Sequence, residues 1–211
     1  MKHRKLKVAI ILCTLLWTAV AMAHATDVED VSRDDAIYRD VVRAHSYGIT
    51  KGVSEHTFRF APQRGITRGE FITMLSRMHI LYTGAQIEGG GSWYEAHMAW
   101  AEEAGLLFWN ESEQSMAHAP LLRKQMAVII YRYFNAYDLR GYFPPVAVIG
   151  APRDVDEISA WARDAMWGVY YIGNGILPGI WEDTNLYFRP QVHVSRADAL
   201  SSAMRMARFM L

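Results

Sequence analysis

The stretch Ile66-Thr67-Arg68-Gly69-Glu70-Phe71 occurs three times in related form along the chain. The second version is Leu122-Arg123-Lys124-Gln125-Met126, and the third is Val194-Ser195-Arg196-Ala197-Asp198-Ala199. In the first version Thr67 and Glu70 have the spacing of a capping box, in which each side chain accepts a hydrogen bond from the other residue's backbone amide. Each version continues into apolar residues at helical spacing. The stretch therefore predicts the first turn of an amphipathic helix in three places, and with it an internal repeat.

The chain begins with the pattern of a secretory signal peptide. Four basic residues within the first seven precede an apolar run from Val8 to about Ala23, and small-x-small sites end at Ala23 and Ala25. The run is about 16 residues, shorter than the roughly 20 that span a bilayer. We expect residues 1–25 to be a signal peptide, cleaved after Ala23 or Ala25, and the mature protein to be secreted without a membrane span. A retained N-terminal anchor is the alternative.

Removal of this segment changes the charge of the protein. It takes away four of the 22 Lys and Arg and none of the 22 Asp and Glu, which leaves 18 basic and 22 acidic side chains, a formal net charge of −4. A nucleic-acid-binding protein would normally carry a basic surplus, so we expect no nucleic-acid partner. The only cysteine, Cys13, is removed as well. Without disulfides, the fold must depend on its apolar core.

The rest of the chain divides into three similar units. We expect them at residues 27–82, at 88–139 in a degenerate form, and at 152–211, with a proline- and glycine-rich linker at 140–151. Each unit reads as a first helix, a glycine-bounded loop and the capped helix. The first helices are expected at about residues 33–47, from Ser92 onward, and at about 159–172.

The ordered motifs of these units resemble the S-layer homology (SLH) domain. The motifs are an Asp-Val lead, a tryptophan near the start of the first helix, Gly-Ile-x-x-Gly, Phe-Arg-Pro and Thr-Arg-Ala-Glu. The best-matched segments are Gly48-Ile49-Thr50-Lys51-Gly52, Phe58-Arg59-Phe60-Ala61-Pro62, residues 66–71 and Ser195-Arg196-Ala197-Asp198. The resemblance covers essentially the whole mature chain. It implies an all-α fold in which three helix-loop-helix repeats have a pseudo-threefold arrangement around a central helical bundle.

The resemblance also implies a function and a set of binding residues. Such domains hold exported proteins non-covalently on the bacterial cell wall by binding a secondary cell-wall polysaccharide, often an anionic one with pyruvate ketals, in grooves between repeats. The residues carried over are the arginines of the capped helices, the acids of the leads, the tryptophans and the loop glycines: Arg68, Arg123, Arg196, Asp30, Asp154, Trp93, Trp161, Gly52 and Gly179. Unit one has Ala36 at the tryptophan position, and in unit two Glu88 is the nearest acid.

These residue types suit an acidic sugar. Arginine in the first turn of a helix adds a charge where free amides and the helix dipole already favour anions. Its guanidinium matches the two oxygens of a carboxylate. Tryptophan offers a flat apolar face, and glycine lets the backbone approach closely. For each residue a plainer role is open, because such arginines are often solvated and such tryptophans often belong to the core.

Other kinds of site have little support in the sequence. The scattered histidines form no metal pair at helical spacing with a carboxylate partner, so we expect no metal and no cofactor. Neighbouring acids such as Glu102 and Glu103 usually meet water, and no catalytic triad or phosphate loop stands out, so we expect no enzyme. The alternative to a wall-binding domain is an exported interaction module with envelope proteins as partners, which keeps the scaffold and has lost sugar binding.

Overall fold

The computed structural model describes residues 28–54, 56–107, 114–139, 151–171 and 175–210. This part of the chain is mostly α-helical, as predicted, with one small sheet. The α-helices are α2 (Tyr38–Ser46), α3 (Arg68–Thr83), α4 (Glu95–Glu103), α5 (Arg123–Ala136), α6 (Arg163–Tyr171) and α7 (Arg196–Met210). Short 3-10 helices are η1 (Gln114–His118), η3 (Val155–Glu157) and η4 (Ala160–Ala162), and the strands are β1 (Ile180–Glu182) and β2 (Asn185–Tyr187).

The three predicted helix starts are confirmed, because α3, α5 and α7 begin at Arg68, Arg123 and Arg196. The capping box of α3 is complete, since the Glu70 amide donates to the Thr67 hydroxyl at 3.3 Å and the Thr67 amide donates to the Glu70 carboxylate at 3.0 Å. At α5 half of the box remains: the Leu122 amide donates to the Gln125 side chain at 2.9 Å. At α7 the Asp198 amide donates to the Ser195 hydroxyl at 3.1 Å.

The segments just before these three helices are joined in a closed triangle of backbone hydrogen bonds. The amide of Ile66 donates to the carbonyl of Val194 (2.9 Å), Val194 donates to Leu121 (2.8 Å), and Leu121 donates back to Ile66 (3.1 Å). All three side chains are buried in the apolar core. The amides of the three arginines form an outer set of bonds, each to a carbonyl of a neighbouring segment: Arg68 to Ala119, Arg123 to Val192 and Arg196 to Arg64.

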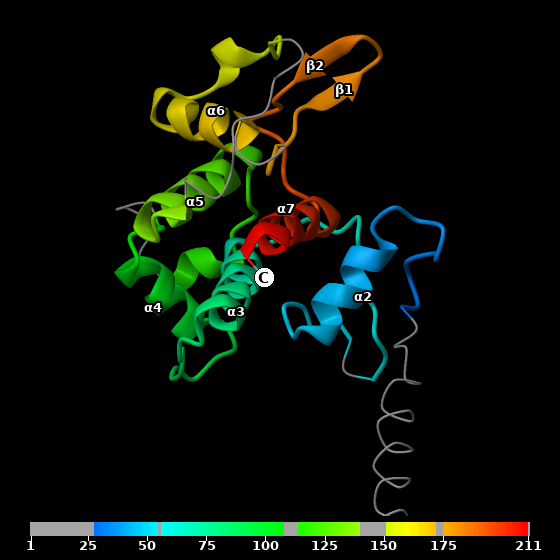
Figure 1. Cartoon of the computed structure of the whole chain (residues 1–211), viewed down its shortest axis with the longest axis vertical. Coiled ribbons are helices and arrows are strands. Elements are labelled where there is room, and N and C mark those ends of the chain that lie inside the picture. Colours follow the sequence, from blue (N-terminus) through cyan, green and yellow to red (C-terminus); the bar gives the residue numbers. More distant parts are fainter. Residues whose placement is uncertain (1–27, 55, 108–113, 140–150, 172–174, 211) are drawn as a thin grey trace, which may run out of the picture.

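The helices pack in a cyclic pattern around this triangle. In each case the second helix of one predicted unit packs against the first helix of the next: α3 against α4, α5 against α6, and α7 against α2. Helices α3 and α7 also pack against each other and lie side by side at the centre of the molecule (Figure 1). The packing therefore joins the chain end to end, because the last helix contacts the first helix described.

One continuous apolar core joins these helices. Phe58, Phe60 and Phe188 are at most 7% exposed, and Met74, Met78 and the other α-helix methionines belong to the same cluster. Met126 and Ile129 of α5 are buried in it as well. Burial of this apolar surface is the main source of stability in a fold without a disulfide framework.

The first helices of the units are shorter than predicted. Helix α2 begins at Tyr38, because Ser32 and Asp35 form a turn in which the Asp35 carboxylate accepts the Ser32 amide at 2.9 Å, a local bond that competes with helix formation. Helix α4 begins at Glu95, so the prediction of Ser92 as its cap was wrong: the Glu95 carboxylate accepts the Gly91 amide instead. The predicted helix from residue 159 is divided into η4 and α6.

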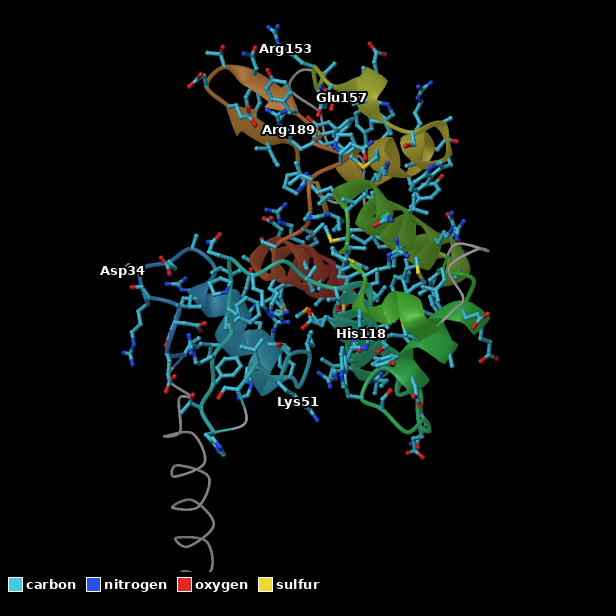
Figure 2. All side chains as sticks on the ribbon, turned by 180° about the vertical axis from the view of Figure 1, so that it is seen from behind. Asp34, Lys51, His118, Arg153, Glu157 and Arg189 are labelled. Atoms are coloured by element: carbon cyan, nitrogen blue, oxygen red, sulfur yellow. The ribbon has the colours of Figure 1, made fainter. Side chains whose placement is uncertain are left out.

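The antiparallel pair β1–β2 was not predicted. It occupies the loop after Gly179, and Ile180 lies opposite Tyr187 in its register. Arg189, which follows β2 (Figure 2), donates two hydrogen bonds to Glu182 and lies 4.3 Å from the Tyr187 ring. Side-chain contacts at the ends of the strands therefore support the short hairpin. Such contacts leave no apolar periodicity in the sequence from which the hairpin could be predicted.

Two predictions fall outside the described residues. The signal peptide at 1–25 lies there entirely, and the linker at 140–151 lies there except for Ala151. Among the helices that the structure describes, none is long and apolar enough to cross a membrane.

The capping box gives a first testable prediction. Replacing Thr67 by Ala removes the acceptor for the Glu70 amide and should lower the free energy of unfolding by about 1 kcal/mol, measured by urea denaturation. Ser46→Ala, an exposed hydroxyl at the end of α2, should change it by less than about 0.5 kcal/mol. Equal stability of the Thr67 variant and the unmodified protein would show that the box does not hold the start of α3.

Candidate ligand-binding groove

The two predicted acidic residues support the backbone of the loops that lead to the capped helices. The Asp30 carboxylate accepts the amides of Phe60 (2.8 Å) and Ala61 (2.7 Å). The Asp154 carboxylate accepts the amides of Phe188 and Arg189, both at 2.6 Å. Ala61 and Arg189 have left-handed backbone conformations, with φ of 56° and 52°. The two carboxylates therefore hold equivalent strained turns, and each carboxylate already accepts two hydrogen bonds, one at each oxygen.

Two of the three predicted arginines extend from a helix start into the neighbouring unit. Arg196 Nε donates to the Phe60 carbonyl at 2.8 Å, and Arg123 Nε donates to the Phe188 carbonyl at 2.9 Å. Arg123 also donates to the carbonyl of Pro178 at 2.7 Å. Both side chains are buried, and burial lowers the pKa of each guanidinium, partly opposed by nearby carboxylates. Their first role is to fix the loops around Asp30 and Asp154.

Arg68 and Trp161 lie elsewhere. Arg68 is buried at the start of α3, with its amide bonded to Ala119. Trp161 lies in η4 and is 52% exposed, with the Lys124 ammonium 5.5 Å from its ring centre. Lys124 also donates to the Ser159 hydroxyl at 3.1 Å, which holds the start of α5 next to this tryptophan.

Three predicted site residues, one from each predicted unit, line a single groove of about 250 Å³: Gly52, Trp93 and Arg196. The loop after α2 contributes residues 49–52, and α3 contributes Glu70, Thr73, Met74 and Arg77. We refer to this site as the Trp93 groove. Trp93 is 52% exposed, so its ring is available as an apolar wall.

Glycine at position 52 is required by its surroundings. Its φ is +79°, and a Cβ at this position would lie 2.7 Å from the carbonyl oxygen of Arg59. The loop can pack closely against the segment of Phe58 and Arg59 only because this side chain is absent. Gly179 has a different constraint, since a Cβ there would meet the Leu186 side chain of β2.

The Trp93 groove carries a surplus of positive charge. Its lining includes Lys51, Arg77 and Arg196, against the single acid Glu70. Glu70 is itself paired, because Arg64 donates to its carboxylate and Arg196 Nη1 lies 3.5 Å from it. Burial lowers the pKa of the Arg77 guanidinium. The arrangement of cations beside an exposed aromatic ring suits an anionic ligand with an apolar face.

Lys51, Thr73 and Arg77 were not among the predicted site residues. The side chain of Lys51 extends from the loop after α2 (Figure 2). Thr73 and Arg77 are four residues apart on α3 and so share one face of that helix. A signal for both was present: they are polar positions within the apolar run from Phe71 to Met78. Sequence alone did not show that this face meets the Gly52 loop.

His97 of α4 contacts α3 through a hydrogen bond. Its Nδ1 lies 2.7 Å from the Ser76 hydroxyl. Burial lowers the pKa of His97, and the positive charges of Arg77 and Lys51 lower it further. The histidine is thus close enough to be influenced by two of the three cations of the groove, Arg77 and Lys51.

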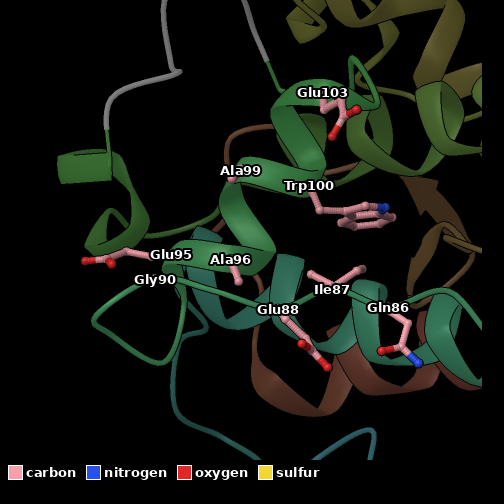
Figure 3. Close-up of a pocket in the computed structure, with 9 residues that line it drawn as sticks. All are labelled: Gln86, Ile87, Glu88, Gly90, Glu95, Ala96, Ala99, Trp100 and Glu103. Carbon is pink, nitrogen blue, oxygen red and sulfur yellow. The ribbon is translucent and has the colours of Figure 1, made fainter.

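A second cavity, of about 410 Å³, has the opposite charge. Glu88, Glu95 and Glu103 line it around the ring of Trp100 (Figure 3), together with Gln86 and Ala96. We call it the acidic pocket. Figure 3 shows Glu88 and Glu103 on opposite sides of the indole, while Glu95 points away. Its described lining contains no Lys or Arg, so it does not suit the anionic ligand that the Trp93 groove fits.

A comparison with known families finds a match at the first predicted unit. Residues 29–72 match the family model of the S-layer homology domain. The matched segment contains Asp30, Gly52 and Arg68. This domain is a non-enzymatic module that is generally associated with anchoring proteins to the bacterial cell wall. No curated protein matches the chain. The predicted units at 88–139 and 152–211 stay predictions.

The role of Asp154 can be tested by removing its charge. Asp154→Asn turns one acceptor oxygen into a donor that faces the amides of Phe188 and Arg189, so the free energy of unfolding should fall by about 2–3 kcal/mol. Asp156→Asn, at an exposed site two residues away, is the matched control and should change it by less than about 0.5 kcal/mol. If both variants unfold at the same urea concentration, the Asp154 carboxylate does not brace the loop.

The lowered pKa values of two histidines predict that the stability of the protein depends on pH. Burial lowers the pKa of His79 and of His97 from their ordinary value of 6.5. The unfolded chain therefore binds protons more readily, and stability should be lost as the pH falls from about 6.5 through the lower pKa values of the folded state. Urea midpoints at pH 7.5 and 5.5 measure this loss. His97→Gln should reduce it, whereas His193→Gln, at an exposed site, should not. Equal midpoints at the two pH values would contradict the prediction.

Proposed function

We propose that this protein binds an anionic secondary cell-wall polysaccharide non-covalently in the Trp93 groove, and that this binding holds it on the surface of a bacterial cell after export. The observation that carries the proposal is the meeting of the exposed Trp93 ring, the Gly52 loop and the cations Lys51, Arg77 and Arg196 at one groove. No step of chemistry is needed, because retention on the wall requires only binding.

The proposal includes a three-repeat architecture in which units 27–82, 88–139 and 152–211 are related by a pseudo-threefold axis. It is supported by the triangle of bonds among Ile66, Leu121 and Val194, where each segment donates to one neighbour and accepts from the other. The cyclic packing of α3 on α4, α5 on α6 and α7 on α2 supports it as well. In this architecture a groove forms between units, and the Trp93 groove draws on all three.

The grooves are not equivalent. By the proposed symmetry, the groove at Arg123 and Gly179 takes its tryptophan position from unit one, where Ala36 stands in place of an aromatic residue. Arg123 and Arg196 both donate through Nε to a backbone carbonyl, and Arg123 donates a further hydrogen bond to the carbonyl of Pro178. We therefore assign the main binding role to the Trp93 groove.

The second candidate function is that of an exported protein-interaction module. The acidic pocket favours it, because carboxylates beside Trp100 suit a basic side chain of a partner protein better than a sugar carboxylate. The two functions use different residues, because α4 contributes to the lining of the acidic pocket and not to that of the Trp93 groove, and they can be separated by mutation.

The experiment is sedimentation of the mature protein with purified cell walls, before and after chemical removal of the secondary polymer. Binding should depend on the polymer. Trp93→Ala should weaken it about tenfold, because the ring supplies the apolar face for the sugar. Trp181→Ala is the matched control, since Trp181 is equally exposed, at 57%, but lies on β1 away from the groove.

Two results would overturn the assignment. Equal binding by the Trp93 and Trp181 variants would exclude the Trp93 groove as the site. Binding that persists after removal of the polymer would point to peptidoglycan or a wall protein, and loss of that binding on replacing Glu88 and Glu103 by Gln would support the interaction module instead.

A further inference from the structure

One buried hydroxyl in the Trp93 groove has no partner among the described residues. Thr73 is 3% exposed, and its Oγ1 makes no hydrogen bond. Other hydroxyls of α3 bond back to the helix: Ser76 donates to the Thr73 carbonyl (3.1 Å) and Thr83 to the His79 carbonyl (2.8 Å). A buried polar group is nearly always hydrogen-bonded, so this hydroxyl at the lining of a groove needs a partner from outside the described residues, which a ligand or a water molecule can supply.

The cations beside Thr73 are also available. Arg77 lies one helical turn further along the same face of α3, and Lys51 lies on the opposing loop. Within the part of the chain that the structure describes, neither side chain forms an ion pair or a hydrogen bond. Their charges are directed at the groove and are not neutralised there.

Arg196 differs from these two cations. Its Nε donates to the Phe60 carbonyl, its Nη1 lies 3.5 Å from Glu70, and its guanidinium lies 5.1 Å from the centre of the Phe60 ring. At 3% exposure it is part of the protein framework. Replacing it would disturb the Phe60 loop, so its effect on binding would not identify a ligand contact.

We propose that Lys51, Thr73 and Arg77 form the anion subsite of the Trp93 groove, where they bind the acidic group of the sugar. This inference rests on the proposed function and names the part of the groove that recognises charge. Arg77 and Lys51 supply the positive charge, and the Thr73 hydroxyl donates a hydrogen bond to one oxygen of a carboxylate or phosphate. Trp93 holds the ring of the same sugar.

The test uses the binding of defined sugars to the mature protein, measured by calorimetry. The probes are a methyl hexoside with a 4,6-O-pyruvate ketal, the methyl ester of that ketal, and glucose 6-phosphate. Thr73→Val keeps the shape of the side chain and removes the donor, so it should weaken binding of the charged ketal by about tenfold or more, as expected for loss of a hydrogen bond to a charged group. Arg77→Met should weaken it at least as much.

Matched controls separate this effect from folding. Arg39→Met removes an exposed charge on α2 outside the groove, and Thr57→Val removes an exposed hydroxyl, so both should bind the ketal normally. Thr73→Val should unfold at the same urea concentration as the unmodified protein or a higher one, because its hydroxyl is unsatisfied in the free groove. If the protein binds the ketal more strongly than glucose 6-phosphate, the acidic group of its ligand is a carboxylate. If it binds glucose 6-phosphate more strongly, the acidic group is a phosphate.

Three outcomes would overturn the subsite. Normal ketal binding by Thr73→Val and Arg77→Met would exclude these residues while leaving the groove intact. Equal affinity for the ketal and its uncharged methyl ester would exclude an anion subsite. Failure of the unmodified protein to bind both the charged probes and the wall polymer would overturn the proposed function, and the subsite with it.

Discussion

The closed triangle of hydrogen bonds among Ile66, Leu121 and Val194 is the constraint on which the rest of the structure depends. Each residue immediately precedes a cap position, so the bonds set the starting points of α3, α5 and α7 relative to one another. Their side chains are buried, which places the triangle within the core, where unpaired amides and carbonyls would be costly. From these starts α3 packs against α4, α5 against α6, and α7 against α2.

The same constraint explains why the groove contains residues distant in sequence. The bond from the Arg196 amide to Arg64 brings the start of α7 beside the loop that leads to α3, and the Arg196 side chain then reaches Phe60. The Gly52 loop and Trp93 line the groove together with residues of α3. Framework and ligand contact are thus separate tasks: buried arginines hold the loops, while Lys51, Thr73 and Arg77 present unused polar groups.

Much of this fold could be predicted, since helix caps and apolar spacing are local properties. Thr67 and Glu70 have the spacing of a capping box, which predicted the start of α3. The turn at Ser32 and Asp35 and the hairpin after Gly179 depend on side-chain contacts that periodicity does not record. In the groove, Gly52, Trp93 and Arg196 were predicted from a family resemblance. Thr73 and Arg77 were missed because their role depends on which helix face the Gly52 loop meets, which only tertiary packing decides.

The central claim is that a wall polysaccharide binds in the Trp93 groove, and a titration followed by two-dimensional NMR tests it most directly. A polymer fragment released from the wall is added to the isotope-labelled mature protein while the backbone amides and indole N–H groups are observed. If the polysaccharide binds in this groove, the Gly52 amide and the Trp93 indole will shift together, with one affinity. Shifts confined to the Trp100 indole and the amides of Glu88 and Glu103 would contradict it and would place the ligand in the acidic pocket.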